Sequence, residues 1–227
     1  LEGLNPADIL DAQESDNTKL PSLSGTNLVH GAAEGDFFKA SHGFNGKTFS
    51  LIISNPPWAE PEQDDRTSAD AWAEREEQFI VRRQIAGAYA LRARDFLAPE
   101  GRVCLILPIG QILGPSSAAF VDRLLNEYQP DKLINFGDLQ QLLFPTAENT
   151  CHIFIGRLRA TDAEGRIPLG ETFDYLVPKA DLSLALGRLT MQSADRHRLS
   201  HAGFLQRRRG RRIRGSRSLV PTHRRRA

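Results

Sequence analysis

The sequence lacks several features that define specialised classes of protein. Its 227 residues contain no run of eighteen apolar residues, which predicts that no helix spans a membrane. No basic segment followed by an apolar one opens the chain, so secretion is not indicated. The two cysteines, Cys104 and Cys151, show no metal-ligand spacing and lie in apolar runs. We therefore expect no metal site, and two reduced thiols in the core of a cytoplasmic protein.

Acidic residues and lysine are absent after Asp195. Of the 29 basic residues, 12 are arginines between Arg196 and the end of the chain, which leaves 17 basic against 28 acidic residues and a net charge of −11 for the remainder. This change of composition predicts a disordered arginine-rich tail at 205–227. We favour a tail without a binding role, which is either translated in a shifted frame or, equally, a solvated tail, and the alternative is a sequence-independent phosphate anchor.

Methionine is absent from position 1 and occurs only at Met191, so we expect a fragment of a longer protein. Strand–helix alternation begins at a short candidate strand, 27–31, and predicts an α/β fold with a largely parallel sheet. The expected strands are Phe49–Ser54, 102–108, 131–136 and 151–156, and the last could insert antiparallel because no helix precedes it. The expected helices are 68–97, with an interruption at Gly87, and one from Ser116 or Ser117 to Tyr128. Beyond Arg159 we expect no strong elements.

An unusual corner, Asn55-Pro56-Pro57-Trp58, directly follows the apolar run that ends at Ser54. Ligands of open α/β sheets bind beyond the carboxyl ends of the strands. Two prolines make a stiff loop whose backbone polar groups are carbonyls, and Asn55 adds a side-chain oxygen that accepts hydrogen bonds. With the flat indole of Trp58, these groups suit a planar ring that carries an exocyclic amino group. A turn without a ligand is the plainer interpretation.

The motif Ile53-Ser54-Asn55-Pro56-Pro57-Trp58 resembles the catalytic motif of S-adenosylmethionine-dependent amino methyltransferases, and most closely that of adenine-specific N6 DNA methylases of restriction–modification systems. The segment from Asn27 to Phe38 resembles the strand whose acid, here Asp36, holds the adenine of the cofactor. Residues 101–110 resemble the next strand, and Phe144-Pro145 with 150–155 resemble the segment that packs on the extruded base. The likeness implies a Rossmann-like methyltransferase fold.

The resemblance also implies roles for single residues. An adenine extruded from double-stranded DNA would stack on Trp58, a contact worth roughly 1–3 kcal/mol, with Phe144 packing on the base. The Asn55 side chain and the Pro56 carbonyl would accept the two N6 hydrogens, held by the stiff Pro56-Pro57 corner. Asp36 and Asn55 would contact S-adenosylmethionine. A specificity or restriction subunit is a further implied partner.

The glycine-rich cofactor loop of this family is missing, so we expect an incomplete fold that binds cofactor weakly or not at all. The predicted organisation is a linker or remnant at 1–24, a methyltransferase catalytic half at 25–160, a weakly structured extension at 161–204, and the tail. Two alternatives stay open, namely an amino methyltransferase acting on protein glutamine or an RNA base, and an inactive remnant that at most binds nucleic acid. Arg82, Arg83, Arg92 and Arg94 form a basic helical stretch, interpreted as a solvated face or, alternatively, as phosphate contacts.

Overall fold

A computed structural model of the chain describes residues 35–143, 145, 149–160 and 171–210. The chain divides into two compact units, Leu1–Gly46 and Lys47–Ala227. In the described part of the first unit, Phe37 contacts Phe38 and His42 edge-on, and His42 in turn contacts Phe44. The candidate strand 27–31 lies outside the described residues. In the part of the chain that the structure describes, no helix is both long and apolar enough to cross a membrane.

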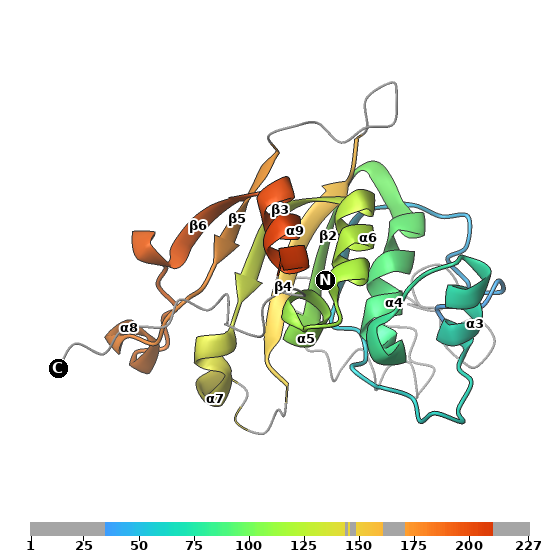
Figure 1. The fold of residues 1–227 in the computed structure, drawn as a ribbon, viewed down its shortest axis with the longest axis horizontal. Helices are drawn as coiled ribbons and strands as arrows, with labels where there is room; N and C mark the ends of the chain where they lie inside the picture. Colours follow the sequence, from blue (N-terminus) through green and yellow to red (C-terminus); the bar gives the residue numbers. More distant parts are fainter. Residues whose placement is uncertain (1–34, 144, 146–148, 161–170, 211–227) are drawn as a thin grey trace, which may run out of the picture. The chain divides into compact units, whose positions relative to one another are not determined.

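The second unit is built on one mixed sheet (Figure 1). Its described strands stand in the order β1-β2-β4-β3-β5-β6, with β1 at Phe49–Ser54, β2 at Leu97–Pro108, β3 at Tyr128–Asn135, β4 at Cys151–Leu158, β5 at Thr172–Leu176 and β6 at Arg196–Ser200. The pairs β1–β2 and β3–β5 are parallel, whereas β4 pairs antiparallel with both β2 and β3. The predicted α/β class and the antiparallel insertion of β4 are therefore confirmed. The expectation of a largely parallel sheet is wrong, because three of the five described strand pairs, β2–β4, β3–β4 and β5–β6, are antiparallel.

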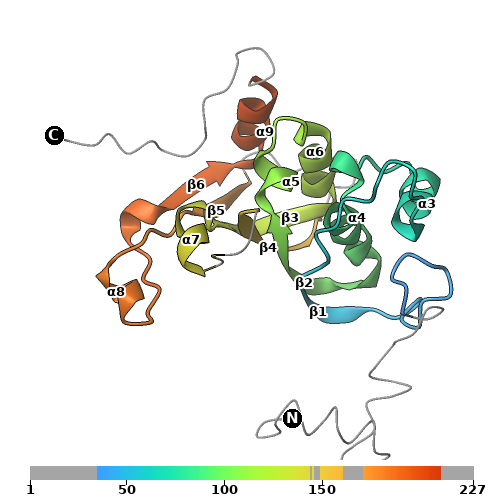
Figure 2. The ribbon, with the colours of Figure 1, turned by 90° about the horizontal axis from the view of Figure 1, so that it is seen from below.

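Helices cover one face of this sheet. They are α3 at Ser68–Arg75, α4 at Ile85–Arg92, α5 at Ile109–Leu113, α6 at Ala118–Glu127 and α9 at His201–Gly210, with short α7 at Gln140–Leu143 and α8 at Leu182–Ala185 near the far edge. The described residues also form short 3₁₀ turns, η1 at Val81–Arg83, η2 at Ala93–Phe96, η3 at Gly137–Leu139 and η4 at Ser193–Asp195. Figures 1 and 2 both show α4, α6 and α9 on the same side of the sheet. Because residues of a strand alternate between faces, this layer buries every second residue.

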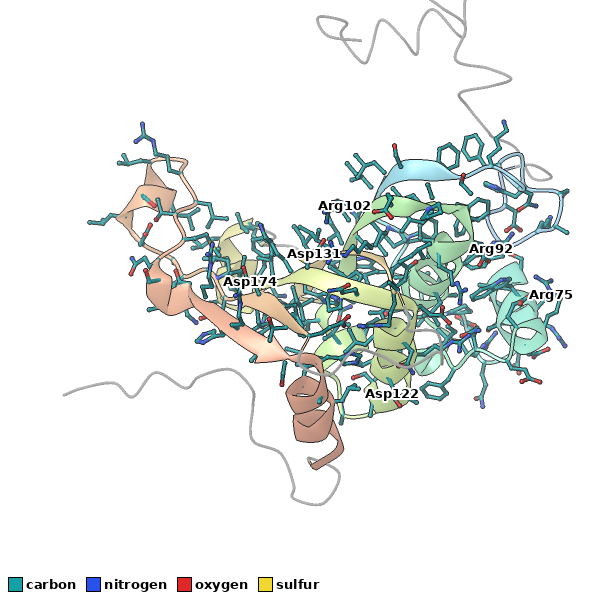
Figure 3. The ribbon with its side chains drawn as sticks, turned by 90° about the horizontal axis from the view of Figure 1, so that it is seen from above. Arg75, Arg92, Arg102, Asp122, Asp131 and Asp174 are labelled. Carbon is teal, nitrogen blue, oxygen red and sulfur yellow. The ribbon has the colours of Figure 1, made fainter. Side chains whose placement is uncertain are left out.

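The two faces of the sheet differ in burial. On the face beneath the helices, Leu105 and Phe154 are register partners, and both are at most 1% exposed. On the other face, which we call the open face, the register brings Ile53, Cys104 and Ile155 into one row. Ile53 is 71% exposed there, so the expectation of a strand covered on both faces is wrong for β1. Ion pairs cross the strands at one end of this face, where Arg102 contacts Asp131 and Arg157 lies 3.8 Å from the same carboxylate (Figure 3).

The predicted helix over 68–97 is interrupted, although not at Gly87. Thr67 caps α3 through a reciprocal pair of hydrogen bonds with Asp70. The chain then leaves the helical conformation between 76 and 84 and re-enters it in α4, with Gly87 inside that helix. Glu77, Arg82 and Arg83 have positive φ angles of 51°, 50° and 56°. Such angles are uncommon for residues with a Cβ, and they produce the break.

The chain beyond Arg159 is more ordered than the sequence indicated. It contributes β5, β6 and α9, where we expected no strong elements. Phe204 of α9 stacks edge-on against Phe173 of β5, and the buried Arg159 contacts both Glu171 and His201. Residues 205–210 belong to α9, which differs from the disorder expected there, and 211–227 lie outside the described residues. The domain boundaries drawn from the sequence stay a prediction.

Candidate active site

The Asn-Pro-Pro-Trp corner lies beyond the carboxyl end of β1. The last register pair between β1 and β2 joins Ser54 to Leu105, so the corner begins where the two strands part. Asn55 and Pro57 are exposed, whereas Pro56 is buried. A buried proline between two exposed residues anchors a loop whose φ is already fixed. The Asn55 side chain thus stands in solvent at the end of a strand.

Trp58 is held in place by its own polar atom. The indole Nε1 donates a hydrogen bond of 3.3 Å to the carbonyl of Ile106, one residue past the last β1–β2 pair. The half-buried ring packs against a cluster formed by Phe136, Leu139 and Cys151. Because the protein satisfies the indole N–H, Trp58 has only its aromatic surface left to offer a ligand.

The structure brings together three of the segments that the sequence singled out. Pro108 at the end of β2 is the register partner of Cys151 at the start of β4, and Asn135 of β3 is the partner of His152. The Ile109 amide donates to the Thr150 carbonyl at 2.8 Å. The ends of β1, β2 and β3 and the beginning of β4 therefore meet at one edge, where the Asn-Pro-Pro-Trp corner also lies. Such an edge is the usual place of a ligand site in an α/β sheet.

The roles of two further predicted site residues stay predictions. Phe144, predicted to pack on the base, lies outside the described residues. Asp36 belongs to the first unit, where its carboxylate accepts the Phe38 amide at 3.0 Å and pairs with Lys39 at 3.7 Å. An aspartate that bonds the amide two residues on is a common turn former. The cofactor role of Asp36 stays a prediction.

A polar bridge, which the sequence did not reveal, fixes the loop that follows Trp58. The Gln111 side chain, on α5, donates to the Gln84 side chain, whose own Nε2 lies 3.5 Å from Glu60 Oε1. The Ile85 amide also donates to the Ala59 carbonyl at 3.0 Å. These bonds join the loop after Trp58 to the starts of α4 and α5. Nothing in the spacing of two isolated glutamines signals such a bridge.

The bridge depends on close packing between α4 and α5. A Cβ placed on Gly87 would lie 2.6 Å from Gln111 Oε1, which is closer than real Cβ contacts allow. This oxygen has no hydrogen-bond partner, and Gln111 is 2% exposed. Glycine at position 87 is therefore what leaves room for the Gln111 amide.

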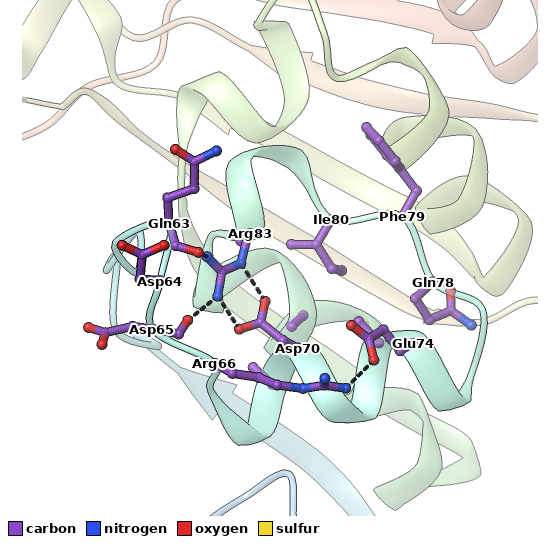
Figure 4. A pocket seen from close by; sticks show the side chains of 13 residues that line it. Gln63, Asp64, Asp65, Arg66, Asp70, Glu74, Gln78, Phe79, Ile80 and Arg83 are labelled. Atoms are coloured by element: carbon purple, nitrogen blue, oxygen red, sulfur yellow. Dashed lines mark hydrogen bonds and ion pairs between the residues drawn. The ribbon is translucent and has the colours of Figure 1, made fainter.

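A second anchor, Arg83, holds the outer part of the same loop (Figure 4). Its guanidinium bonds both carboxylate oxygens of Asp70, at 2.9 and 2.6 Å, and donates to the carbonyls of Glu62 at 2.8 Å and Gln63 at 3.3 Å. The hydrogen bonds from Arg83 hold the pKa of Asp70 well below its usual range. Arg83 lines a cavity of about 510 Å³ between α3 and this loop. The role of Arg83 is structural, because all of these contacts tie the loop to α3.

A small cavity separates the loop after Trp58 from α5. It measures about 130 Å³, and the residues that line it include Glu60, Arg82, Gln84, Pro108, Gln111, Ser116 and Asn149. Most of these side chains are polar, and Pro108 marks the end of β2. In the described residues, no group of three or more histidine, cysteine or acidic side chains gathers to hold a metal ion. The side chains at this edge offer hydrogen bonding, stacking and charge.

Comparison with known proteins places the chain among restriction–modification methylases. The family model "Eco57I restriction-modification methylase" matches residues 8–142, a span that includes the whole Asn-Pro-Pro-Trp corner. No curated protein sequence matches the chain.

Several solved structures are similar to this chain at low sequence identity. The type IIG restriction endonuclease BpuSI has a TM-score of 0.50 and 11% identity, over 70% of this chain and 20% of that one. The M protein of the type I restriction enzyme EcoKI has a TM-score of 0.45 and 10% identity, over 86% and 36% of the two chains. The type I methyltransferase subunit from Streptococcus thermophilus has a TM-score of 0.43 and 13% identity, over 75% and 32%.

The chain thus spans between a fifth and about a third of the length of these structures. Its mixed sheet, with six described strands, shares the fold of the matched part of BpuSI. With more than half of its residues inside the family model, this chain belongs to the Eco57I restriction-modification methylase family.

Proposed function

We propose that this chain belongs to an adenine-specific DNA methyltransferase that uses S-adenosylmethionine, and that it binds the DNA base that receives the methyl group. The observation that carries the proposal is the corner beyond β1, where an exposed Asn55 stands next to a tethered, half-buried Trp58. Membership in a restriction–modification methylase family supports DNA as the substrate. An amide oxygen and a proline carbonyl beside an aromatic ring suit an amino group on a purine.

The proposed mechanism places the base before any chemistry occurs. The adenine leaves the duplex, because its amino nitrogen cannot be reached inside the stack. It stacks on the Trp58 ring, whose orientation is fixed by the bond to Ile106. The Asn55 side-chain oxygen and the Pro56 carbonyl then accept the two N6 hydrogens, which turns the nitrogen lone pair out of conjugation with the ring. Orientation of this kind supplies much of the barrier reduction in reactions of bound partners.

The described residues do not fit S-adenosylmethionine by themselves. The carboxylate of Asp36, the predicted adenine contact, is engaged with the Phe38 amide and Lys39. The sequence holds no glycine-rich loop after a strand to grip the methionine end of the cofactor. We therefore assign this chain the acceptor side of the reaction and derive no step on the donor.

Base binding can be tested without knowing the recognition sequence. The probe is a duplex with one adenine opposite an abasic site, which costs little to extrude. We expect this duplex to quench Trp58 fluorescence more than duplexes with thymine or guanine at that position, while Trp72, 4% exposed in α3, serves as an internal reference. Trp58→Ala should weaken binding by about 1–3 kcal/mol, roughly 5- to 150-fold.

Asn55 variants sharpen the test of base identity. Asn55→Ala should remove the preference for adenine. Asn55→Asp keeps an acceptor oxygen and should therefore preserve the preference for adenine. Asn126→Ala, at an exposed position on α6, is the matched control. Equal quenching by all three bases, or an adenine preference that survives Asn55→Ala, would contradict the proposal.

A second candidate is a protein that binds the base without transferring a methyl group. The lack of a cradle for the cofactor among the described residues favours it. Labelled S-adenosylmethionine offered with duplex DNA, RNA or a glutamine peptide separates the candidates. Label in DNA adenine supports methyl transfer to DNA, label in RNA or peptide moves the substrate to that polymer, and adenine-dependent quenching without label supports binding alone.

A further inference from the structure

The four arginines between 82 and 94 have different surroundings. Arg83 is fastened to Asp70 and to loop carbonyls, and Arg92 is 5% exposed with its guanidinium 5.7 Å from the Phe96 ring. Arg94 pairs with Glu127. Arg82 differs, because its side chain is 74% exposed and its ion pair with Glu60 is 3.9 Å long. A pair so long and so exposed contributes little free energy, so the Arg82 guanidinium remains open to a stronger anion.

The backbone at Arg82 is strained. Its φ and ψ of 50° and 29° are left-handed, and the next residue, Arg83, is left-handed as well. A residue with a Cβ pays conformational free energy there that glycine would not. The contacts of Arg83 hold the kink in place, since they tie it to Asp70 and to the loop at 62–65. Position 82 favours glycine but carries an arginine, which points to a use for the arginine side chain.

The kink places Arg82 beside the candidate active site. Arg82 lines the cavity of about 130 Å³ together with Glu60, Ser116 and Asn149. Glu60 lies two residues after Trp58 in the chain. The cavity is smaller than the 300–1,000 Å³ or so of pockets that enclose drug-sized ligands, and it suits a compact group. Ser116 and Asn149 add a hydroxyl and an amide donor to its lining, next to the Arg82 guanidinium.

We propose that Arg82 binds the DNA backbone phosphate next to the adenine that is extruded toward Trp58. This inference rests on the proposed function. The planar guanidinium offers two parallel N–H groups that match a phosphate, and hydroxyl and amide side chains are common additional phosphate contacts. Glu60 releases Arg82 when the phosphate arrives, because the charge-assisted bond to phosphate is shorter and stronger than a 3.9 Å pair in solvent. Arg82 then fixes the flanking nucleotide while the base enters the corner.

The test measures binding of the full chain to the adenine–abasic duplex by fluorescence anisotropy across a series of salt concentrations. Removing one phosphate contact lowers the slope of log K against log salt by about 0.9. We expect Arg82→Ala to show this loss of slope with roughly tenfold weaker binding at low salt, and Arg82→Lys to keep the slope. Glu60→Gln should bind the duplex a few-fold more tightly, because it frees Arg82.

Arg82→Gly separates a binding role from a structural one. Glycine accepts the left-handed backbone, so this variant should melt no lower than the unaltered chain while losing the same slope as Arg82→Ala. Arg66→Ala is the matched control, since Arg66 is 69% exposed and pairs with Glu74 on α3. It should leave both the slope and the affinity unchanged.

Three outcomes would overturn the inference. An unchanged slope in Arg82→Ala, with adenine-dependent quenching of Trp58 intact, would remove Arg82 as a phosphate contact and leave the proposed function standing. A lower melting temperature in Arg82→Gly would show that the arginine serves the fold. A chain that binds neither the adenine duplex nor its thymine counterpart would remove the proposed function together with the phosphate contact.

Discussion

The two faces of the sheet show how differently neighbouring residues of one strand are used. Beneath the helices, Val103, Leu105 and Leu107 of β2 are all 0% exposed. On the open face, the intervening Cys104 and Ile106 are only half-buried, and Ile53 in the adjacent strand is 71% exposed. The strands look uniformly apolar in sequence, yet the helix-covered face carries most of the burial. The candidate site lies where the open face ends, at the tethered Trp58.

Truncating one side chain on each face is the strongest way to test this difference. Phe154→Ala, at a residue 1% exposed under the helices, should cost about 3–5 kcal/mol of unfolding free energy. Ile53→Ala on the open face should cost roughly 0.5 kcal/mol or less, because little apolar area leaves contact. Urea denaturation of both variants measures the gap. Similar losses would mean that the open face is covered in solution.

Acid should weaken the helix-covered face through His152. Burial lowers the pKa of this imidazole to about 3, and neither ring nitrogen has a hydrogen-bond partner. The unfolded chain takes up a proton near pH 6.5, whereas the folded chain does so only near pH 3, so stability falls as pH drops through this window. The loss from this group approaches 1.4 kcal/mol per pH unit.

His152→Leu should remove that contribution and flatten the stability curve between pH 6 and 4, in the window that the His152 pKa defines. Urea midpoints at several pH values, for the unaltered chain and the variant side by side, isolate the histidine from carboxylates that titrate in the same range. Parallel curves for the two proteins would contradict a neutral, buried His152.

A further expected effect concerns the packing between α4 and α5 in the helix layer. Gly87→Ala should cost about 1–3 kcal/mol, because the new Cβ meets Gln111 Oε1 at 2.6 Å. Gly110→Ala in α5 is the control, since no atom lies within 4 Å of its Cβ, and it should be neutral or stabilise by up to about 1 kcal/mol. Adding Gln111→Ala to Gly87→Ala should recover part of the loss. Thermal melts of Gly87→Ala, Gln111→Ala, the double variant and the unaltered chain give the coupling.

Much of the sheet could be predicted because strands that pair deep in an α/β core have continuous apolar runs. The bounds of β1 match the predicted Phe49–Ser54, and β4 begins at Cys151 as expected. The exposure of Ile53 could not be predicted, because burial depends on what packs against a strand and not on its own composition. β5 and β6 were missed for a related reason. Thr172–Leu176 is a strand because it pairs with β3, which lies far from it in the sequence.

The break between α3 and α4 was also beyond sequence reasoning. Glutamate and arginine favour helices, yet Glu77, Arg82 and Arg83 have positive φ angles, and the tertiary contacts of Arg83 hold the kink at 82 and 83. For the candidate site, the place of the Asn-Pro-Pro-Trp corner directly after a strand could be predicted from the sequence, whereas its role stays a prediction. The Gln84–Gln111 bridge and the placement of Arg82 could not, because they join residues that only the fold brings together.

The position of β4 sets an order of events during synthesis. β4 stands between β2 and β3, although it leaves the ribosome after both of them. A nascent chain that ends before Cys151 therefore has β2 and β3 without the strand that lies between them. The main-chain N–H and C=O groups on their facing edges have no strand partner until β4 has been synthesised. β4, at the centre of this sheet, is the last of the four long described strands to be synthesised. The packing of Trp58 against the cluster that contains Cys151 forms only then.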